Sequence, residues 1–136
     1  METDLSVHSF HNPPVDNDNS YYDINIKISI RNKMIKDILI TCFEGASNYW
    51  IDSVKIIDDY KGDIYDAIIN GHEIEIMVEG KRFILTKKTF ISGCQNYANN
   101  TEYQVGAAHI FFNEDFDAEI ADVILQYSLF NEIVYG

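Results

Sequence analysis

The chain has 136 residues, of which 22 are acidic and 10 are basic, so its net charge is −12 at neutral pH. This length suits one domain that buries about two-thirds of its unfolded surface, without a disulfide or a structural metal. The negative charge argues against direct binding to nucleic acid, because a protein must bring cations to the phosphates.

The compartment is indicated by the two cysteines and by the absence of a targeting segment. Cys42 and Cys94 fall on apolar helical faces, and no signal peptide or transmembrane run is visible. We therefore expect reduced thiols in the core, a cytoplasmic protein and no membrane partner.

The first 20 residues show no sustained periodicity and contain Pro13-Pro14 and a polar run at 16–20. They predict a flexible N-terminal arm, residues 1–20, in front of a single globular domain, residues 21–136. His8 and His11 are three residues apart, but two histidines without further ligands do not indicate a metal site.

Residues 22–30 give the clearest strand pattern in the chain. The apolar side chains at alternate positions are Tyr22, Ile24, Ile26, Ile28 and Ile30. The residues between them are mainly polar, which is typical of a strand with one buried and one solvated face.

A helix is predicted for residues 32–43, because apolar residues recur there at the spacing of one helical face. Gly45 follows at a position that suits a left-handed C-terminal cap. Residues 49–57 are apolar on both faces, which predicts a central strand covered on both sides.

Residues 58–71 are acidic and interrupted by glycines, so we expect a loop with at most a helical turn at 65–69. Residues 72–78 and 82–86 then predict a hairpin that turns at 79–81. Thr86 is placed to cap a second helix.

Residues 96–112 are rich in asparagine and aromatic residues, and they are interpreted as a long functional connection. The last helix is expected to begin near Asp115 or Asp117, with Glu119 and Asp122 on its outer face. After it, Ile133 and Tyr135 are expected to dock on the body. Taken together, these patterns predict an α+β domain, with a mainly antiparallel sheet of about four strands and about three helices packed on it.

The stretch between the first helix and the next strand brings several binding-type groups together. It comprises Glu44, Ser47, Asn48, Tyr49 and the only tryptophan, Trp50. Aromatic rings can stack on a base and amides can hydrogen-bond to its edge, so the corner is a candidate ligand site. The alternative interpretation is a capped helix whose following strand supplies core aromatics.

This corner and the C-terminus resemble a family of small proteins encoded by tailed bacteriophages. The matching segments are EGASNYW at 44–50 and QYSLFNEIVYG at 126–136. Family members carry an EGGSNYW-like corner and an LFGE(I/V)VYG-like tail, so this chain differs at Ala46 and Asn131, where glycine is expected. The resemblance spans roughly residues 30–136 and implies a phage origin, but it assigns no catalytic residues.

Motifs for enzyme chemistry are absent from the sequence. There is no phosphate-binding loop, dinucleotide fingerprint, CxxC pair or HExxH helix. Glu44, Ser47 and His72 or His109 could meet as a hydrolytic set, but in so acidic a chain such triples carry little information. We therefore expect no catalytic residues, no cofactor and no metal.

Together these features predict a phage-encoded, non-enzymatic counter-defence protein that neutralises a host factor in the host cytoplasm. The favoured mechanism is sequestration of a nucleotide-like signal near Ser47 to Trp50. The first alternative is an acidic inhibitor that plugs a basic groove of a host defence protein, and the second is a virion or assembly component. The candidate partner-binding acids are Asp58, Asp59, Asp63, Asp66, Glu119 and Asp122. Whether the chain forms a homo-oligomer is left open.

Overall fold

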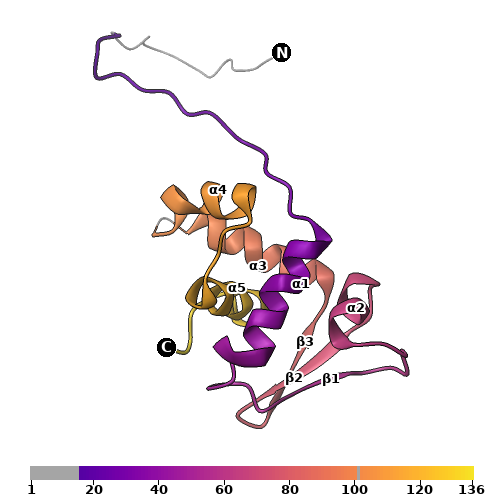
Figure 1. Cartoon of the computed structure of the whole chain (residues 1–136). Coiled ribbons are helices and arrows are strands. Elements are labelled where there is room, and N and C mark those ends of the chain that lie inside the picture. The colour runs from indigo at the N-terminus through magenta and orange to yellow at the C-terminus, as the bar shows by residue number, and fades with distance from the viewer. Residues whose placement is uncertain (1–15, 101) are drawn as a thin grey trace, which may run out of the picture.

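The computed structural model describes residues 16–100 and 102–136, which form the α+β fold that the sequence predicts (Figure 1). The elements in chain order are α1 (Asn32–Thr41), the π-helical turn η1 (Cys42–Ala46), β1 (Ser53–Ile56), α2 (Ile64–Ile69), β2 (Ile74–Val78), β3 (Lys81–Leu85), α3 (Lys87–Asn99), α4 (Gln104–Asn113) and α5 (Ala118–Phe130). The described residues thus contain one antiparallel sheet of three strands and five α-helices, whereas about four strands and three helices were expected.

The sheet has the order β1-β2-β3. The predicted hairpin is confirmed, with Val78 paired to Lys81 across the turn. Its two turn residues, Glu79 and Gly80, have φ values of 50° and 77°, the left-handed conformation that a two-residue hairpin turn requires.

The expected central strand at 49–57 is wrong in length and in position. Only Ser53–Ile56 form β1, which pairs with β2 alone and is therefore an edge strand. Ile56 is half-buried and Ile57 is 39% exposed. Apolar residues on both faces here reflect a turn at Trp50 followed by a short edge strand.

The core lies between the sheet and the helices, with α1, α3 and α5 gathered over one side (Figure 1). Its largest fully buried side chains are Phe90, Met34, Ile35, Ile38, Leu39, Ile68, Ile74, Ile76, Leu85, Ile124, Leu125 and Gln126. Helices α3 and α5 approach especially closely at Gly93, where an added Cβ would lie 2.7 Å from the Cα of Ser128.

Capping residues define three helix starts. Asp63, Thr86 and Asp117 each accept a hydrogen bond from the backbone N–H three residues later. This confirms the predicted cap at Thr86 and the predicted start of the last helix. That helix ends at Asn131, whose φ of 61° explains why glycine would also suit this position.

The strand predicted at 22–30 is not formed. Residues 21–31 are extended but unpaired within the described chain, and Figure 1 shows this segment leading away from the body. Ile24 and Ile26 are 81% and 73% exposed, whereas Ile28 and Ile30 pack against the core. Alternation gives a segment the capacity to pair, but a strand also needs a neighbouring edge.

The long connection predicted at 96–112 is also wrong, because α3 continues to Asn99 and α4 begins at Gln104. Asn100 makes the short turn between them by accepting the Glu102 backbone N–H on its side chain, at 2.9 Å. Of the predicted arm, residues 1–15 lie outside the described residues, as do His8 and His11.

Candidate functional site

The corner after α1 is shaped by the wide turn η1. The Ser47 N–H donates to the carbonyl of Cys42, five residues earlier, at 2.9 Å. Gly45 has a φ of 177°, which is extended backbone, so the predicted left-handed cap at this glycine is wrong. The wider turn directs Ser47 and Trp50 into the protein, and they are 0% and 5% exposed.

Both side chains meet Asp122 of α5. One carboxylate oxygen accepts hydrogen bonds from Ser47 Oγ at 2.6 Å and from Trp50 Nε1 at 2.7 Å. The other accepts from Tyr49 OH at 2.7 Å and from Gln126 Nε2 at 3.1 Å. Four donors thus surround one buried carboxylate, which is how a buried charge is stabilised without a cation.

The prediction that Asp122 lies on the outer face of its helix is therefore wrong, since the residue is only 7% exposed. Asp122 and Gln126 are four residues apart and hence on one face of α5, which is turned toward the corner. An acid in a mostly apolar helix was interpreted as solvent-facing, although here it marks a buried polar network. Glu119, one turn earlier, is exposed as expected.

Gln126 fixes the C-terminal segment to this network. Its Oε1 accepts the backbone N–H groups of Val134 and Tyr135, both at 2.8 Å. Its Nε2 donates to the carbonyl oxygen of Tyr135 at 3.1 Å. The side-chain amide thus both accepts hydrogen bonds from the backbone of the tail and donates one to it, as the backbone of a neighbouring strand would.

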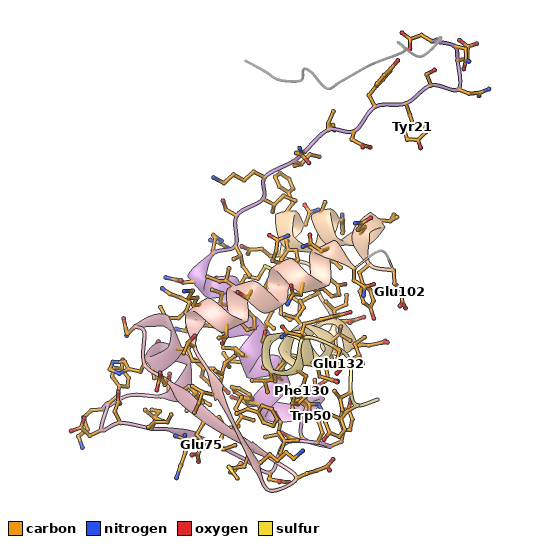
Figure 2. The ribbon with its side chains drawn as sticks, turned by 180° about the vertical axis from the view of Figure 1, so that it is seen from behind. Tyr21, Trp50, Glu75, Glu102, Phe130 and Glu132 are labelled. Carbon is orange, nitrogen blue, oxygen red and sulfur yellow. The ribbon has the colours of Figure 1, made fainter. Side chains whose placement is uncertain are left out.

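An aromatic layer covers the network. The ring of Tyr135 stacks on Trp50 with centroids 5.5 Å apart and an angle of 2° between the planes. Phe130 lies on Trp50 at the same distance, and Figure 2 shows these two labelled residues together. Docking of Tyr135 is confirmed, but the docking predicted for Ile133 is wrong, because that side chain is 41% exposed.

The two segments of the phage-family resemblance therefore meet in one place. Ser47, Tyr49 and Trp50 come from the first segment, and Gln126 and Tyr135 come from the second. Asp122, which links them, lies outside both segments. Ser47, Tyr49 and Trp50, which were proposed to contact a ligand, instead bond Asp122, and this favours a structural role for the corner.

The remaining corner residues face outward. Asn48 is exposed and Tyr49 is 59% exposed, while Glu44 accepts a hydrogen bond from Tyr65 OH at 3.1 Å. Burial of the hydroxyl end, together with the Asp122 carboxylate, raises the pKa of Tyr49 to about 12. The residues considered as a hydrolytic set have separate partners: Ser47 bonds Asp122, Glu44 bonds Tyr65, and His72 and His109 contact Asp58 and Asp115.

The acidic residues of the 58–66 loop mostly have local partners. Asp58 lies 2.7 Å from His72 Nδ1, which lowers the pKa of that carboxyl, and Asp63 caps α2. Asp66 is half-buried and pairs with Lys36 at 3.0 Å, whereas Asp59 is exposed. Among residues 16–100 and 102–136, no three His, Cys, Asp or Glu side chains are arranged to hold a metal ion.

An exposed apolar surface lies on α4, within the segment 96–112 that the sequence analysis interpreted as a functional connection. Val105 and Phe112, one above the other on this helix, are 96% and 78% exposed. Glu102 precedes the helix and Asp115 follows it, and both are exposed. We call these four residues the α4 surface, and Figure 1 shows α4 at the periphery, far from the sheet.

Positive and negative residues are unevenly distributed along the chain, and the α4 surface belongs to a part that has no lysine or arginine. Residues 89–136 contain no lysine or arginine, whereas they contain seven acids, namely Glu102, Glu114, Asp115, Asp117, Glu119, Asp122 and Glu132. The ten cations all belong to residues 1–88, and Arg31 is bonded to Glu114 at 2.6 Å. The net charge of −12 alone does not reveal this imbalance between the two parts of the chain.

Two hollows are formed by residues outside the corner segment 44–50. One, of about 310 Å³, is bounded by residues 26–30, α3 and α4. The other, of about 390 Å³, lies between β3, the end of α5 and the tail. Residues 44–50 line neither of them, so the ligand pocket expected there stays a prediction.

Within the part of the chain that the structure describes, every helix is too short or too polar to cross a lipid bilayer. Comparisons with protein-family models, with curated proteins and with solved structures find no significant match to the chain.

Proposed function

We propose that the protein is a non-enzymatic binding protein of a tailed bacteriophage, which neutralises a host defence protein in the host cytoplasm by covering a basic, partly apolar surface. The observation that supports this function best is the α4 surface, where two exposed apolar side chains lie in a part of the chain that has no lysine or arginine. The phage origin comes from the resemblance of the corner and tail motifs.

The chemistry of the α4 surface fits a protein partner. Phe112 and Val105 offer apolar area that water solvates poorly, and exposed apolar groups surrounded by polar ones are typical of interaction sites. Glu102 and Asp115 flank them and would attract a cationic partner over distance. A partner with lysines or arginines around an apolar recess would therefore bind with the recess over Val105 and Phe112 and its cations beside Glu102 and Asp115.

Sequestration of a small nucleotide-like signal at the corner has less support. Ser47 and Trp50 are buried, and their donors are already bonded to Asp122. A ligand there would meet mainly Asn48 and the exposed part of Tyr49.

The test is a host-protection assay combined with capture from host extracts. Phe112→Ala with Glu102→Lys and Asp115→Lys should abolish both phage protection and partner capture, while the free energy of unfolding stays nearly unchanged. A matched control, Asp52→Lys with Glu73→Lys, makes the same charge change at exposed positions near the sheet and should keep both activities.

Salt provides a second criterion, because exposed charges are screened beyond about 10 Å at 0.1 M salt. Capture by the wild-type protein should weaken as salt is added. Full protection by the α4 variant would refute the proposed surface. A protein found only in purified virions would instead indicate an assembly component.

A further inference from the structure

The segment of residues 21–27 has the properties of a strand that lacks a partner. Tyr22, Ile24 and Ile26 alternate with more polar residues and are 69%, 81% and 73% exposed. The backbone groups of residues 21–30 form no hydrogen bond with the described chain. Such a segment gains both hydrogen bonds and burial if it joins the edge of a sheet.

The chain also offers an open sheet edge at β3. Val78 and Lys81 flank a two-residue turn and exchange hydrogen bonds, so the backbone groups of Arg82 and Ile84 point away from β2. These groups form no hydrogen bond with the described residues. The hollow of about 390 Å³ lies along this strand, with Phe83, Phe130 and Tyr135 in its lining.

We propose that residues 21–25 of one copy of the chain add to β3 of a second copy as an antiparallel fourth strand. Pairing Asp23 with Arg82 places Tyr22 opposite Phe83, on the side of the hollow, because neighbouring residues alternate between the two faces. The same register places Tyr21 opposite Ile84.

Charge favours this occupant and this direction. The segment carries Asp18 and Asp23, whereas β3 carries Lys81 and Arg82 and is followed by Lys87. In the antiparallel register Asp23 faces Arg82, whose guanidinium also bonds Glu75 at 2.5 Å, and Asp18 approaches Lys87. A parallel strand would place Asp18 beyond the hairpin turn, on the side of Glu79, where like charges repel.

The position of the segment favours a strand from another copy. Ile28 and Ile30 pack against the core and hold the segment at the start of α1, and Figure 1 shows residues 21–27 leading away from the body on the side opposite the β2–β3 turn. With ten residues, α1 is about 15 Å long, and residues 21–27 extend away from it. Reciprocal exchange between two copies closes a two-fold dimer in which the β3 edge of each copy is paired.

The first test measures the molar mass of the full chain over a concentration series by light scattering and sedimentation. The wild-type protein should be a dimer. Tyr22→Asp should weaken dimerisation roughly 100-fold or more, since the register places the new carboxylate against the ring of Phe83 at the hollow. Val105→Asp is the control, because it introduces the same carboxylate at a 96% exposed position on α4 and should leave the dimer intact.

A second measurement tests the register. Tyr21→Cys with Ile84→Cys should form a disulfide between copies under mild oxidation, while Cys42 and Cys94 are buried and contribute little. Tyr21→Cys with Lys55→Cys, on the other edge strand, should cross-link far less. A monomer at all concentrations, a Tyr22→Asp variant that still dimerises, or equal cross-linking by both cysteine pairs would overturn the proposal.

Discussion

Asp122 gives the sharpest test of how the fold is held together, because one carboxylate accepts four hydrogen bonds. Asp122→Ala removes the acceptor from three buried side chains, Ser47, Trp50 and Gln126, which are 0%, 5% and 0% exposed. Tyr49 is 59% exposed, so its hydroxyl can turn to water instead.

The expected cost follows from these contacts. Each buried donor left without a partner costs about 1–3 kcal/mol, and the relief of no longer burying the carboxylate offsets part of the sum. We expect Asp122→Ala to lower the free energy of unfolding by about 3–5 kcal/mol, a large share of the roughly 5–15 kcal/mol of a typical domain.

Asp122→Asn removes the charge of the side chain but keeps its shape. The remaining carbonyl oxygen still accepts from Ser47 and Trp50, but the new amide N–H₂ faces the Gln126 Nε2 group, which is also a donor. Gln126 cannot simply rotate, because its Oε1 holds two backbone N–H groups of the tail. This variant should lose about 1–3 kcal/mol.

The assay is urea denaturation followed by the fluorescence of Trp50, the only tryptophan, with circular dichroism as a second probe. Glu119→Ala on the same helix is exposed and should change stability by less than about 0.5 kcal/mol. A cost below about 1 kcal/mol for Asp122→Ala, or an equal cost for Glu119→Ala, would refute the network as a source of stability.

Two further predictions concern glycines and thiols. In the same titration Gly93→Ala should lower the free energy of unfolding by more than about 2 kcal/mol, because the new methyl would overlap Ser128. Gly106→Ala has open space around it and should stabilise α4 by about 0.5–1 kcal/mol. The reverse order would disprove the close α3–α5 packing. Burial raises the pKa of the Cys42 and Cys94 thiols to about 12, so at pH 8 both should react slowly with a thiol reagent when folded and rapidly in urea. Fast labelling of the folded protein would place that thiol at the surface.

Local signals predicted the elements whose geometry depends on a few neighbouring residues. The Thr86 cap, the hairpin turn at Glu79-Gly80 and the apolar face of α1 all follow from short-range chemistry, and all are confirmed. The α+β class followed from them.

Long-range pairing could not be predicted in the same way. The alternation at 22–30 describes a segment that is able to pair, but whether an edge is within reach depends on where α1 directs it. Asparagines at 96–100 suggested an open loop, yet they occupy the end of one helix and a tight turn before the next.

The long-range contacts of the candidate site could not be predicted from the sequence either. The corner motif correctly indicated a turn with converging polar groups, but their common acceptor, Asp122, is 75 residues away from Ser47. An acid on a largely apolar helix, four residues before a glutamine, is the sequence feature that could have indicated a buried network.

The connection between the corner and α5 also has a kinetic consequence. Trp50 is synthesised 72 residues before Asp122, and Tyr135 follows still later, so the ring remains without its partners for most of translation. Contacts between distant parts of a chain close slowly and leave apolar surface open in the meantime. The nascent chain should therefore depend on chaperones until α5 leaves the ribosome, and only then should the corner acquire its native structure.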